Sequence, residues 1–209
     1  MTPRSFLGRL LFATSNPHKL EEVVPIVRPC GIEVFGLDRY EGPSPDEPVE
    51  DADTFEGNAR LKAIGYAAQT GLTCLAEDSG LEVDALDGAP GVHSARYAGA
   101  TGDRAARDQA NNDKLLAAMA EVPDGQRAAR FVCAMVVARP DGTIVAESRG
   151  TFDGEIVRTP RGANGFGYDP LLWLPGEGRT SAELSPEEKN ARSHRGAAAR
   201  TLVEALARG

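Results

Sequence analysis

The stretch FVCAMVVARPDGTIVA, residues 131–146, decides how this chain folds. Its first part, Phe131 to Ala138, is an apolar run, and its last part, Thr143 to Ala146, is a shorter run of the same kind. Between them lies Pro140-Asp141-Gly142, and an Asp-Gly pair between two such runs is typical of a tight turn that joins antiparallel strands. The sequence therefore predicts a β-hairpin here.

On the N-terminal side of the hairpin, apolar runs alternate with helical patterns. The run at residues 10–13 is followed by Asn16 and Pro17, which suit the N-cap and the first position of a helix. A second apolar run follows at residues 31–37. The pattern predicts a strand, a helix and a second strand.

A further helix is expected to open at Thr54. Asn58 and Lys62 lie four residues apart on it, so their side chains can point together at a site. Residues 41–54 before it are acidic and rich in proline, which fits a solvated linker equally well as a segment that faces a cleft.

The next apolar run leads directly into Glu77 and Asp78. We expect the strand to end at these two carboxylates and the chain to turn at Ser79-Gly80. A strand end followed by a glycine turn is a common place for chemistry in α/β proteins, because the sheet holds the backbone while the loop reaches solvent.

The C-terminal half continues the alternation. Residues 103–120 form a helix by composition, residues 162–170 form a glycine-rich loop, and Ser185 to Glu188 is a capping box that opens a helix carrying Lys189. A terminal helix follows, with an apolar face at Ala199, Leu202, Val203 and Leu206. Strands and helices that alternate around one hairpin predict an α/β protein with a mixed sheet.

Composition excludes several classes of protein. The formal charge is −8, from 31 acidic and 23 basic residues, which argues against a nucleic-acid-coating protein but allows a small phosphorylated ligand. The three cysteines have no CxxC spacing, and neither a P-loop nor a Rossmann fingerprint is present. Residues 1–16 have neither the pattern of a signal peptide nor that of a membrane span, so we expect a soluble, cytoplasmic protein.

Polar clusters at the ends of the expected elements are the candidates for chemistry. They mix cations with carboxylates, and they are Thr14-Ser15-Asn16 with Lys19, Glu50 and Asp51, Asn58 with Lys62, Glu77-Asp78-Ser79, Phe166-Gly167-Tyr168-Asp169, and Lys189 with His194 and Arg195. Cations pair with phosphate oxygens, whereas carboxylates repel them unless a hard cation such as Mg²⁺ lies between. The combination favours a metal–nucleotide substrate and hydrolysis with an aspartate as base.

Each cluster also has a simpler explanation. Asn16 fits a plain helix cap, Lys19 and Lys62 fit solvated helix faces, and Phe166 and Tyr168 fit loop anchors in a core. Only the joint occurrence of these clusters favours a catalytic site.

Five stretches resemble one known family. They are FATSNPHKLEE (12–22), TFEGNARLKA (54–63), LAEDSGLEVDALDGAPGVHSARYAG (75–99), GFGYDPLLWLPG (165–176) and AELSPEEKNARSHRGAAA (182–199). In this order they resemble the inosine triphosphate pyrophosphatases, the Ham1-like non-canonical purine nucleoside triphosphate pyrophosphatases. The resemblance implies one domain over residues 1–209, homodimeric and elongated, with a nucleotide cleft between two lobes. It also implies Mg²⁺-dependent hydrolysis of ITP, dITP and XTP to the monophosphate and pyrophosphate, which keeps deaminated purines out of nucleic acid.

The resemblance assigns a role to each matching position. Asp78 corresponds to the general base and a metal ligand, Glu50 to the second metal carboxylate, and Ser79 to a substrate contact. The triphosphate loop corresponds to Thr14, Ser15, Asn16, Pro17, His18 and Lys19. The positions that hold the purine base correspond to Phe166, Gly167, Tyr168, Asp169, Lys189, His194 and Arg195.

The chain departs from the family pattern at two places. Family members usually have Asp-Asp-Ser-Gly where this chain has Glu77-Asp78-Ser79-Gly80, and Glu-Asn-Ala where it has Gly57 before Asn58, with the acid at Glu56. Glu50, Glu56 and Glu77 therefore stay open as the second metal carboxylate, with Glu50 the first choice. Two other functions also stay open: a Maf-type pyrophosphatase for pyrimidine nucleotides, and a nucleotide-binding regulator without turnover. A nucleic-acid-binding module has little support.

Overall fold

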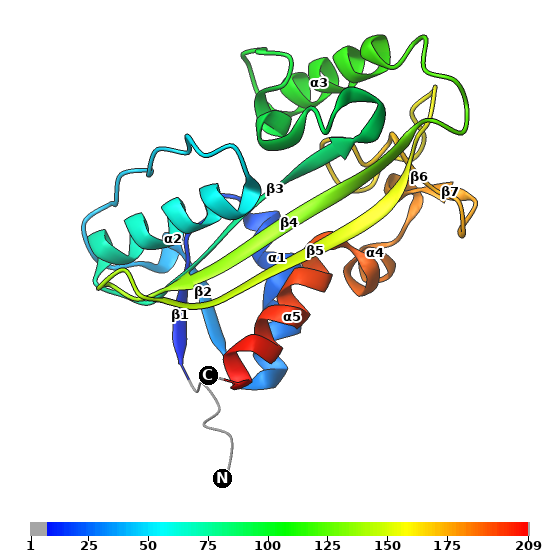
Figure 1. Ribbon diagram of the computed structural model, residues 1–209. Coiled ribbons are helices and arrows are strands. Elements are labelled where there is room, and N and C mark those ends of the chain that lie inside the picture. The colour runs from blue at the N-terminus through cyan, green and yellow to red at the C-terminus, as the bar shows by residue number, and fades with distance from the viewer. Residues whose placement is uncertain (1–7, 209) are drawn as a thin grey trace. The chain divides into compact units, whose positions relative to one another are not determined.

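The computed structural model describes residues 8–208, in which strands and helices alternate (Figure 1). The strands are β1 (Arg9–Phe12), β2 (Glu33–Gly36), β3 (Cys74–Val83), β4 (Ala128–Ala138), β5 (Ile144–Ile156), β6 (Leu172–Leu174) and β7 (Arg179–Thr180). The helices are α1 (Pro17–Val27), α2 (Phe55–Thr70), α3 (Arg104–Ala118), α4 (Pro186–Arg192) and α5 (His194–Arg208), with short 3₁₀ turns between them. The predicted α/β class is confirmed.

The strands form one mixed sheet of seven, in the order β2-β1-β3-β4-β5-β6-β7. β1 pairs in parallel with β2 and β3, with Leu11 opposite Phe35 on one side and Cys74 on the other. Parallel neighbours need a crossover connection, and α1 and α2 supply it. β5, β6 and β7 pair antiparallel, which makes the sheet mixed as the sequence predicts.

The chain divides into two compact units. Unit 1 contains the described residues up to Asp78, Cys133–Gly150 and the residues from His194 onward, and unit 2 contains Ser79–Val132 and Thr151–Ser193. β3, β4 and β5 each begin in one unit and end in the other. The nucleotide cleft between two lobes stays a prediction.

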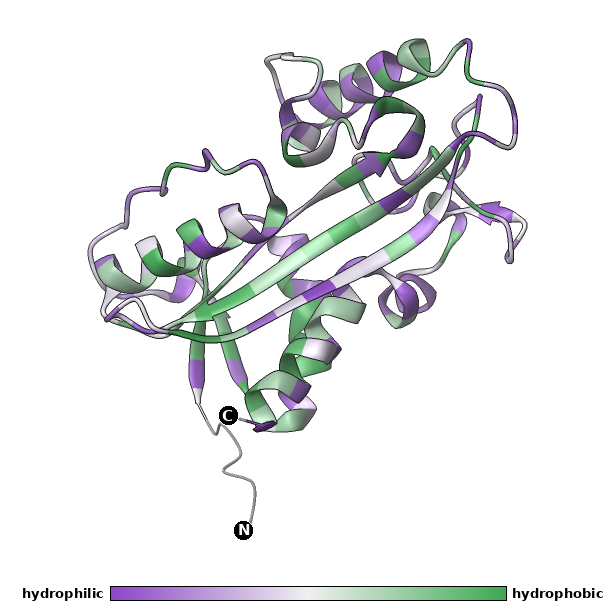
Figure 2. Ribbon diagram, in the orientation of Figure 1, coloured by the Kyte–Doolittle hydropathy of each residue, from purple (hydrophilic) through white to green (hydrophobic). Residues whose placement is uncertain are grey.

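The core of unit 1 is built by alternate residues of its strands. Leu10 and Phe12 of β1, and Cys133, Met135 and Val137 of β4, pack against apolar residues of α1 and α5. Figure 2 shows hydrophobic residues over most of β1 and β2. The buried side chains of these strands and of the two helices therefore form one apolar cluster.

The core of unit 2 forms around α3. Leu115 of this helix and Met119 directly after it are fully buried and pack in one cluster with Leu81 of β3 and Leu172 of β6. The helix predicted over residues 103–120 is expected to turn Leu115, Leu116 and Met119 toward the core, and Leu115 and Met119 are fully buried while Leu116 is partly buried against the same cluster.

Local capping signals are also confirmed. The side chain of Asn16 accepts a hydrogen bond from His18 N at 3.2 Å and caps α1, and Ser185 and Glu188 form the capping box of α4. In the hairpin, Gly142 has a φ of +84°, and the Asp141 carboxylate accepts a hydrogen bond from Thr143 N at 2.9 Å.

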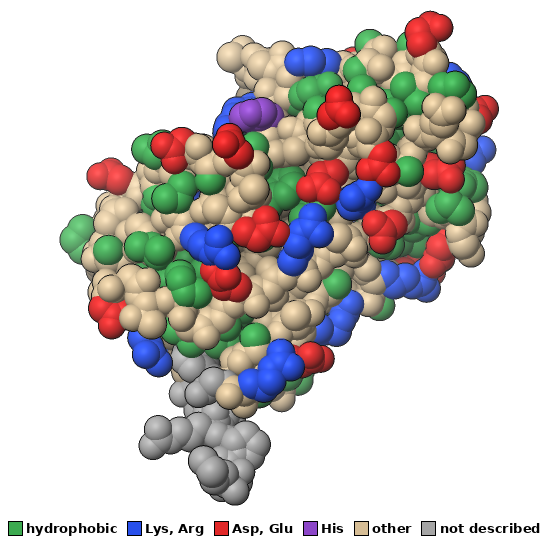
Figure 3. All heavy atoms as spheres, in the orientation of Figure 1, with side chains coloured by type: hydrophobic (Ala, Val, Ile, Leu, Met, Phe, Trp, Pro, Cys, Tyr) green, Lys and Arg blue, Asp and Glu red, His purple; other side chains and the backbone are tan. Residues whose placement is uncertain are grey.

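The surface carries charges of both signs. On the face drawn in Figure 3, Lys and Arg side chains lie among Asp and Glu side chains. The surface ion pairs include that of Arg60 with Glu147, whose Nη2 and Oε2 atoms lie 2.7 Å apart. Within residues 8–208, no helix combines the length and the apolar character needed to cross a membrane. The absence of a signal peptide is predicted for residues 1–16, and residues 1–7 of that segment lie outside the described range.

The expected turn at Ser79-Gly80 is wrong. β3 continues from Cys74 to Val83, so Glu77 and Asp78 lie in the middle of a strand and not at its end. Gly80 has no positive φ and is needed for space, because a Cβ atom there would clash with Ser94 Oγ and lie 2.8 Å from the carbonyl oxygen of Gly91. In a strand interior, glycine often marks such a close approach of backbone, which the sequence alone does not distinguish from a turn.

Replacing Gly80 tests this packing. We expect Gly80→Ala to lower the free energy of unfolding by about 1–3 kcal/mol, the usual cost of overpacking. Urea denaturation measures it. Gly176→Ala is the matched control, because a Cβ atom at Gly176 meets nothing within 4 Å. Equal stability of the two variants would show that the space at Gly80 is not limiting.

Candidate functional site

Neighbouring carboxylates on β3 contact different helices. Glu77 contacts Lys19 of α1 and Arg195 of α5, whereas Asp78 contacts Asn58 and Lys62 of α2. Successive side chains of a strand point to opposite faces of the sheet, so adjacent positions reach different layers. The pair therefore forms two separate polar clusters within unit 1.

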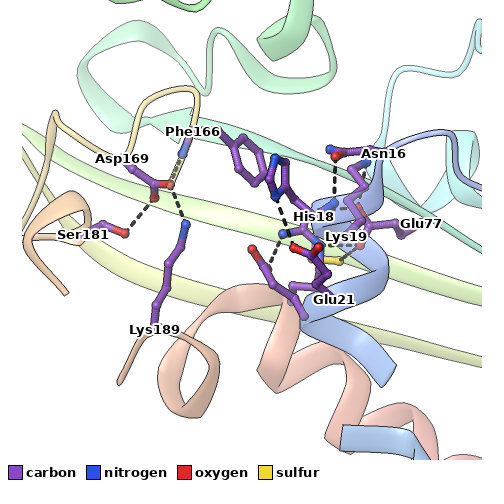
Figure 4. A network of polar contacts seen from close by, with 12 residues as sticks. Asn16, His18, Lys19, Glu21, Glu77, Phe166, Asp169, Ser181 and Lys189 are labelled. Atoms are coloured by element: carbon purple, nitrogen blue, oxygen red, sulfur yellow. Dashed lines mark hydrogen bonds and ion pairs between the residues drawn. The ribbon is translucent and has the colours of Figure 1, made fainter. Parts of the chain in front are cut away.

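The first cluster surrounds the buried side chain of Glu77. Its Oε1 lies 2.7 Å from Lys19 Nζ (Figure 4). Its Oε2 accepts a hydrogen bond from Arg195 Nε at 2.7 Å. Arg195 also donates through Nη1 to Glu22 at 2.7 Å, and the Cys133 thiol donates to Glu77 at 3.3 Å. The cluster thus joins α1, β3, β4 and α5.

The cations decide the ionisation of Glu77. Burial alone would raise the pKa of this carboxyl, but the charges and hydrogen bonds of Arg195 and Lys19 hold the pKa well below its ordinary value of 4.5. Burial raises the pKa of the Cys133 thiol well above its usual range. At neutral pH the cluster therefore contains a carboxylate, two cations and a neutral thiol.

The second cluster surrounds Asp78. Lys62 Nζ donates to Asp78 Oδ1 at 3.2 Å and to Glu50 Oε2 at 3.0 Å, and Asn58 Nδ2 donates to Asp78 Oδ2 at 3.2 Å. Asn58 in turn accepts a hydrogen bond from Ala52 N at 3.0 Å, which ties the segment before α2 to the helix. Burial alone would lower the pKa of Lys62, but Asp78 and Glu50 outweigh burial and raise it. Two carboxylates thus share one ammonium group, which leaves a net negative charge.

The geometry separates the three candidates for the second metal carboxylate. Glu77 is fully engaged with Lys19 and Arg195, and Glu56 lies 3.0 Å from Arg149 in a pair that is about two-fifths exposed. Glu50 is the candidate that shares a cation with Asp78. The geometry therefore favours Glu50.

The segment before α1 is a compact turn. Asn16 N donates to Thr14 Oγ1 at 3.1 Å, while Ser15 and Pro17 are exposed. His18 lies at the surface with its Nδ1 3.3 Å from Glu21 Oε2 (Figure 4). The simple explanation for Asn16, a helix cap, is correct, and Lys19 is an ion-pair partner and not a solvated side chain.

A third cluster lies in unit 2 around Asp169. This buried carboxylate accepts hydrogen bonds from Phe166 N at 2.8 Å, from Lys189 Nζ at 2.5 Å and from Ser181 Oγ at 2.7 Å (Figure 4). Tyr168 is buried and donates to the carbonyl oxygen of Ser94 at 2.8 Å, and burial raises its pKa. The loop that carries Phe166 is therefore held at several points.

A sequence profile of the Ham1 family matches residues 10–205, which include all three clusters. This chain belongs to the Ham1 family. The match begins in β1 and ends in α5.

Relatives in the Ham1 family support the assignment over nearly the full length. A dITP/XTP pyrophosphatase of Corynebacterium glutamicum strain R is 47% identical over 206 residues, which cover 95% of this chain and 97% of the relative. A dITP/XTP pyrophosphatase of Streptomyces coelicolor is 49% identical over 200 residues, covering 94% and 96%. A solved HAM1 protein of Coxiella burnetii is 39% identical with a TM-score of 0.85, covering 96% of this chain and 99% of that one.

The structure gathers many of the residues that the sequence singles out. Glu77 joins Lys19 and Arg195, Asp78 joins Glu50 and Lys62, and Asp169 joins Phe166 and Lys189. His194 is buried at the first position of α5, and Ser79 is partly buried on β3.

Several residues in these clusters are absent from the sequence prediction. Glu22, Ser94 and Ser181 each contribute a contact described above. Glu22 follows Lys19 by three residues on α1, and this spacing is the signal that predicts the two side chains on one face of the helix. Ser94 and Ser181 give no such signal, because their contacts join distant segments.

Neutralising Glu77 tests the buried cluster. We expect Glu77→Gln to lose about 3–5 kcal/mol of stability at pH 7, because a buried Arg195 loses its main partner. The folded pKa of Glu77 is depressed, so its contribution is present above its ordinary pKa of 4.5 and is lost as the pH falls below that value. Urea denaturation between pH 7 and pH 3 should therefore show wild type and variant converging below pH 4.5.

A surface carboxylate serves as the control for this series. Glu33 pairs with Arg9 at 3.3 Å with both side chains more than half exposed, so Glu33→Gln should cost less than about 1 kcal/mol. A difference between wild type and Glu77→Gln that stays constant with pH would contradict the ionised state of Glu77.

Proposed function

We propose that this protein hydrolyses non-canonical purine nucleoside triphosphates, namely ITP, dITP and XTP, to the monophosphate and pyrophosphate. The observation that carries the proposal is the Asp78–Lys62–Glu50 cluster, in which two carboxylates lie around one ammonium group. Family membership and the dITP/XTP pyrophosphatase relatives give further support. The proposal treats residues 1–209 as a single domain.

The carboxylates of this cluster suit Mg²⁺ as the cofactor. Residues 8–208 contain no group of three or more His, Cys, Asp or Glu side chains that could by themselves hold a metal ion. Mg²⁺ is commonly held by only one or two carboxylates together with substrate phosphates, so Asp78 and Glu50 fit this ion. When bound, it would offset phosphate charge and lower the pKa of a water molecule.

Asp78 is proposed as the general base. Its carboxylate accepts a proton from the attacking water, whose oxygen forms a bond to the α-phosphorus. The bond between the α-phosphorus and the bridging oxygen then breaks, and pyrophosphate leaves with the electron pair. Asn58 and Lys62 orient the Asp78 carboxylate, since both donate hydrogen bonds to it.

The triphosphate is proposed to bind the segment from Thr14 to Lys19 and the adjoining start of α1. The N-terminal amide groups of a helix and a neighbouring lysine both favour phosphate oxygens. Ser79 is proposed as a further substrate contact.

The purine base is proposed to bind the loop from Phe166 to Asp169, together with Lys189, His194 and Arg195. Asp169 holds both the Phe166 amide and Lys189 in place, so an aromatic ring from the loop and a cation from α4 lie close to one carboxylate.

Three further properties belong to the proposal. We propose that the protein is a homodimer, acts in the cytoplasm and removes deaminated purines from the nucleotide pool. All three rest on the resemblance to the family.

Product analysis tests the function directly. ITP incubated with the protein and Mg²⁺ should give IMP and pyrophosphate, and EDTA should stop the reaction. Diphosphate and phosphate as products, or no turnover, would overturn the proposal. A comparison of ITP, XTP, GTP, dTTP and UTP separates the Maf-type alternative, because polar recognition of the purine should give at least about tenfold higher kcat/KM for ITP than for the pyrimidine nucleotides.

Asp78→Asn tests the general base. Because a positioned base contributes about 100- to 10,000-fold, we expect kcat for ITP to fall within that range while the variant stays folded. Asp113→Asn on the exposed side of α3 is the matched control and should keep wild-type turnover. Near-normal kcat in Asp78→Asn would remove Asp78 from this role.

Glu50→Gln tests the second metal carboxylate. Loss of one anionic ligand should raise the Mg²⁺ concentration for half-maximal activity by at least about tenfold, with recovery at high Mg²⁺. Glu56→Gln removes a charge from a surface pair and should shift this Mg²⁺ concentration by less than about twofold. A larger shift in Glu56→Gln than in Glu50→Gln would identify Glu56 as the ligand instead.

A further inference from the structure

One stripe of α3 faces the loop that carries Phe166. Arg104, Asp108 and Asn112 are spaced four residues apart, so their side chains project from one side of the helix. All three contact either Phe166 or Gly167. We call this set the α3 stripe.

Two members of the α3 stripe hold the same residue. Gly167 N donates to Asp108 Oδ2 at 2.9 Å, and Asn112 Nδ2 donates to the Gly167 carbonyl oxygen at 3.0 Å. Gly167 has a φ of +61°, in the region that favours glycine. Its amide and its carbonyl are thus both fixed by side chains of one helix.

The third member contacts the neighbouring aromatic ring. The Arg104 guanidinium lies 4.3 Å from the centre of the Phe166 ring, and Lys189 Nζ lies 5.2 Å from it. Phe166 N donates to Asp169, so the residues on both sides of the Phe166–Gly167 peptide bond are anchored. The orientation of the ring therefore depends on α3 as well as on Asp169.

Asn112 carries an unusual feature. Its side chain is more than nine-tenths buried, yet Oδ1 has no hydrogen-bond partner within the described part of the chain. A buried acceptor without a partner is destabilising, and an apolar residue would avoid this cost at a position next to the core residue Leu115. The hydrogen bond that Asn112 Nδ2 donates to the Gly167 carbonyl oxygen accounts for an asparagine at this position.

We infer that the α3 stripe is a positioning element for the purine base: Asp108 and Asn112 fix the Gly167 peptide and, with Arg104, set the orientation of the Phe166 ring against which the base is selected. This inference rests on the proposed function, in which the base binds residues 166–169. The three residues act through the loop and do not take part in the phosphate chemistry.

Two substitutions at Asp108 test the positioning role. Asp108→Ala removes the acceptor for Gly167 N, and we expect KM for ITP to rise about five- to tenfold, the effect of one lost hydrogen bond, with kcat within twofold. The preference for ITP over GTP in kcat/KM should fall by a similar factor. Asp108→Asn keeps an acceptor oxygen at the same place and should restore both values to within about twofold of wild type.

Asn112→Asp is the complementary change. It keeps the size of the side chain but replaces the donor to the Gly167 carbonyl with a carboxylate oxygen, so KM and discrimination should change at least as much as in Asp108→Ala. Asp113→Ala, which removes an exposed acidic residue paired with Gln109 on the same helix, controls for the loss of charge and should leave both values unchanged.

The outcomes separate this inference from the proposed function. If wild type gives no IMP and pyrophosphate from ITP, the proposed function fails. If wild type is active but Asp108→Ala keeps its KM and its preference for ITP, the positioning role alone is wrong. A fall in kcat at constant KM, or an Asp108→Asn variant as impaired as Asp108→Ala, would also overturn it. Thermal melting confirms that each variant is folded, and Asp108 is partly exposed, so its replacement leaves the core of unit 2 intact.

Discussion

The alternation of side chains along β3 is the constraint on which the polar architecture depends. Because Glu77 and Asp78 are neighbours in an extended strand, one must face the layer of α1 and α5 and the other the layer of α2. Glu77 is neutralised by two cations in the interior, where a lone charge would be very costly. Asp78 shares its cation with Glu50 and stays part of an excess of negative charge. Two neighbouring carboxylates therefore lie in different surroundings, one held between two cations and one sharing a single cation with a second carboxylate.

Local signals were sufficient for much of the fold. The Asp141-Gly142 turn, the Asn16 cap and the capping box at Ser185 each depend on residues a few positions apart, so the sequence contains all the information that they need. The same holds for Asn58 and Lys62, whose spacing on a helix makes them converge on one partner. Family resemblance then identified which polar residues to consider together.

The remaining features depend on contacts between distant segments. Glu77 and Arg195 are separated by 118 positions, and no local pattern shows that the arginine of the expected base site is bonded to the first acid of the strand. The prediction of a turn at Gly80 is wrong for a related reason. A glycine that makes room for Ser94 has the same letter as a glycine that turns the chain, and only the packed structure shows which demand applies.

The division of the chain also has a genetic consequence. The polypeptide passes from one unit to the other after residues 78, 132, 150 and 193, so each unit is encoded by several separated stretches of the gene. Recombination between homologues exchanges contiguous stretches, so a stretch that carries the whole of one unit also carries residues of the other. Wherever one unit is transferred whole between genes, part of the other unit is inherited with it.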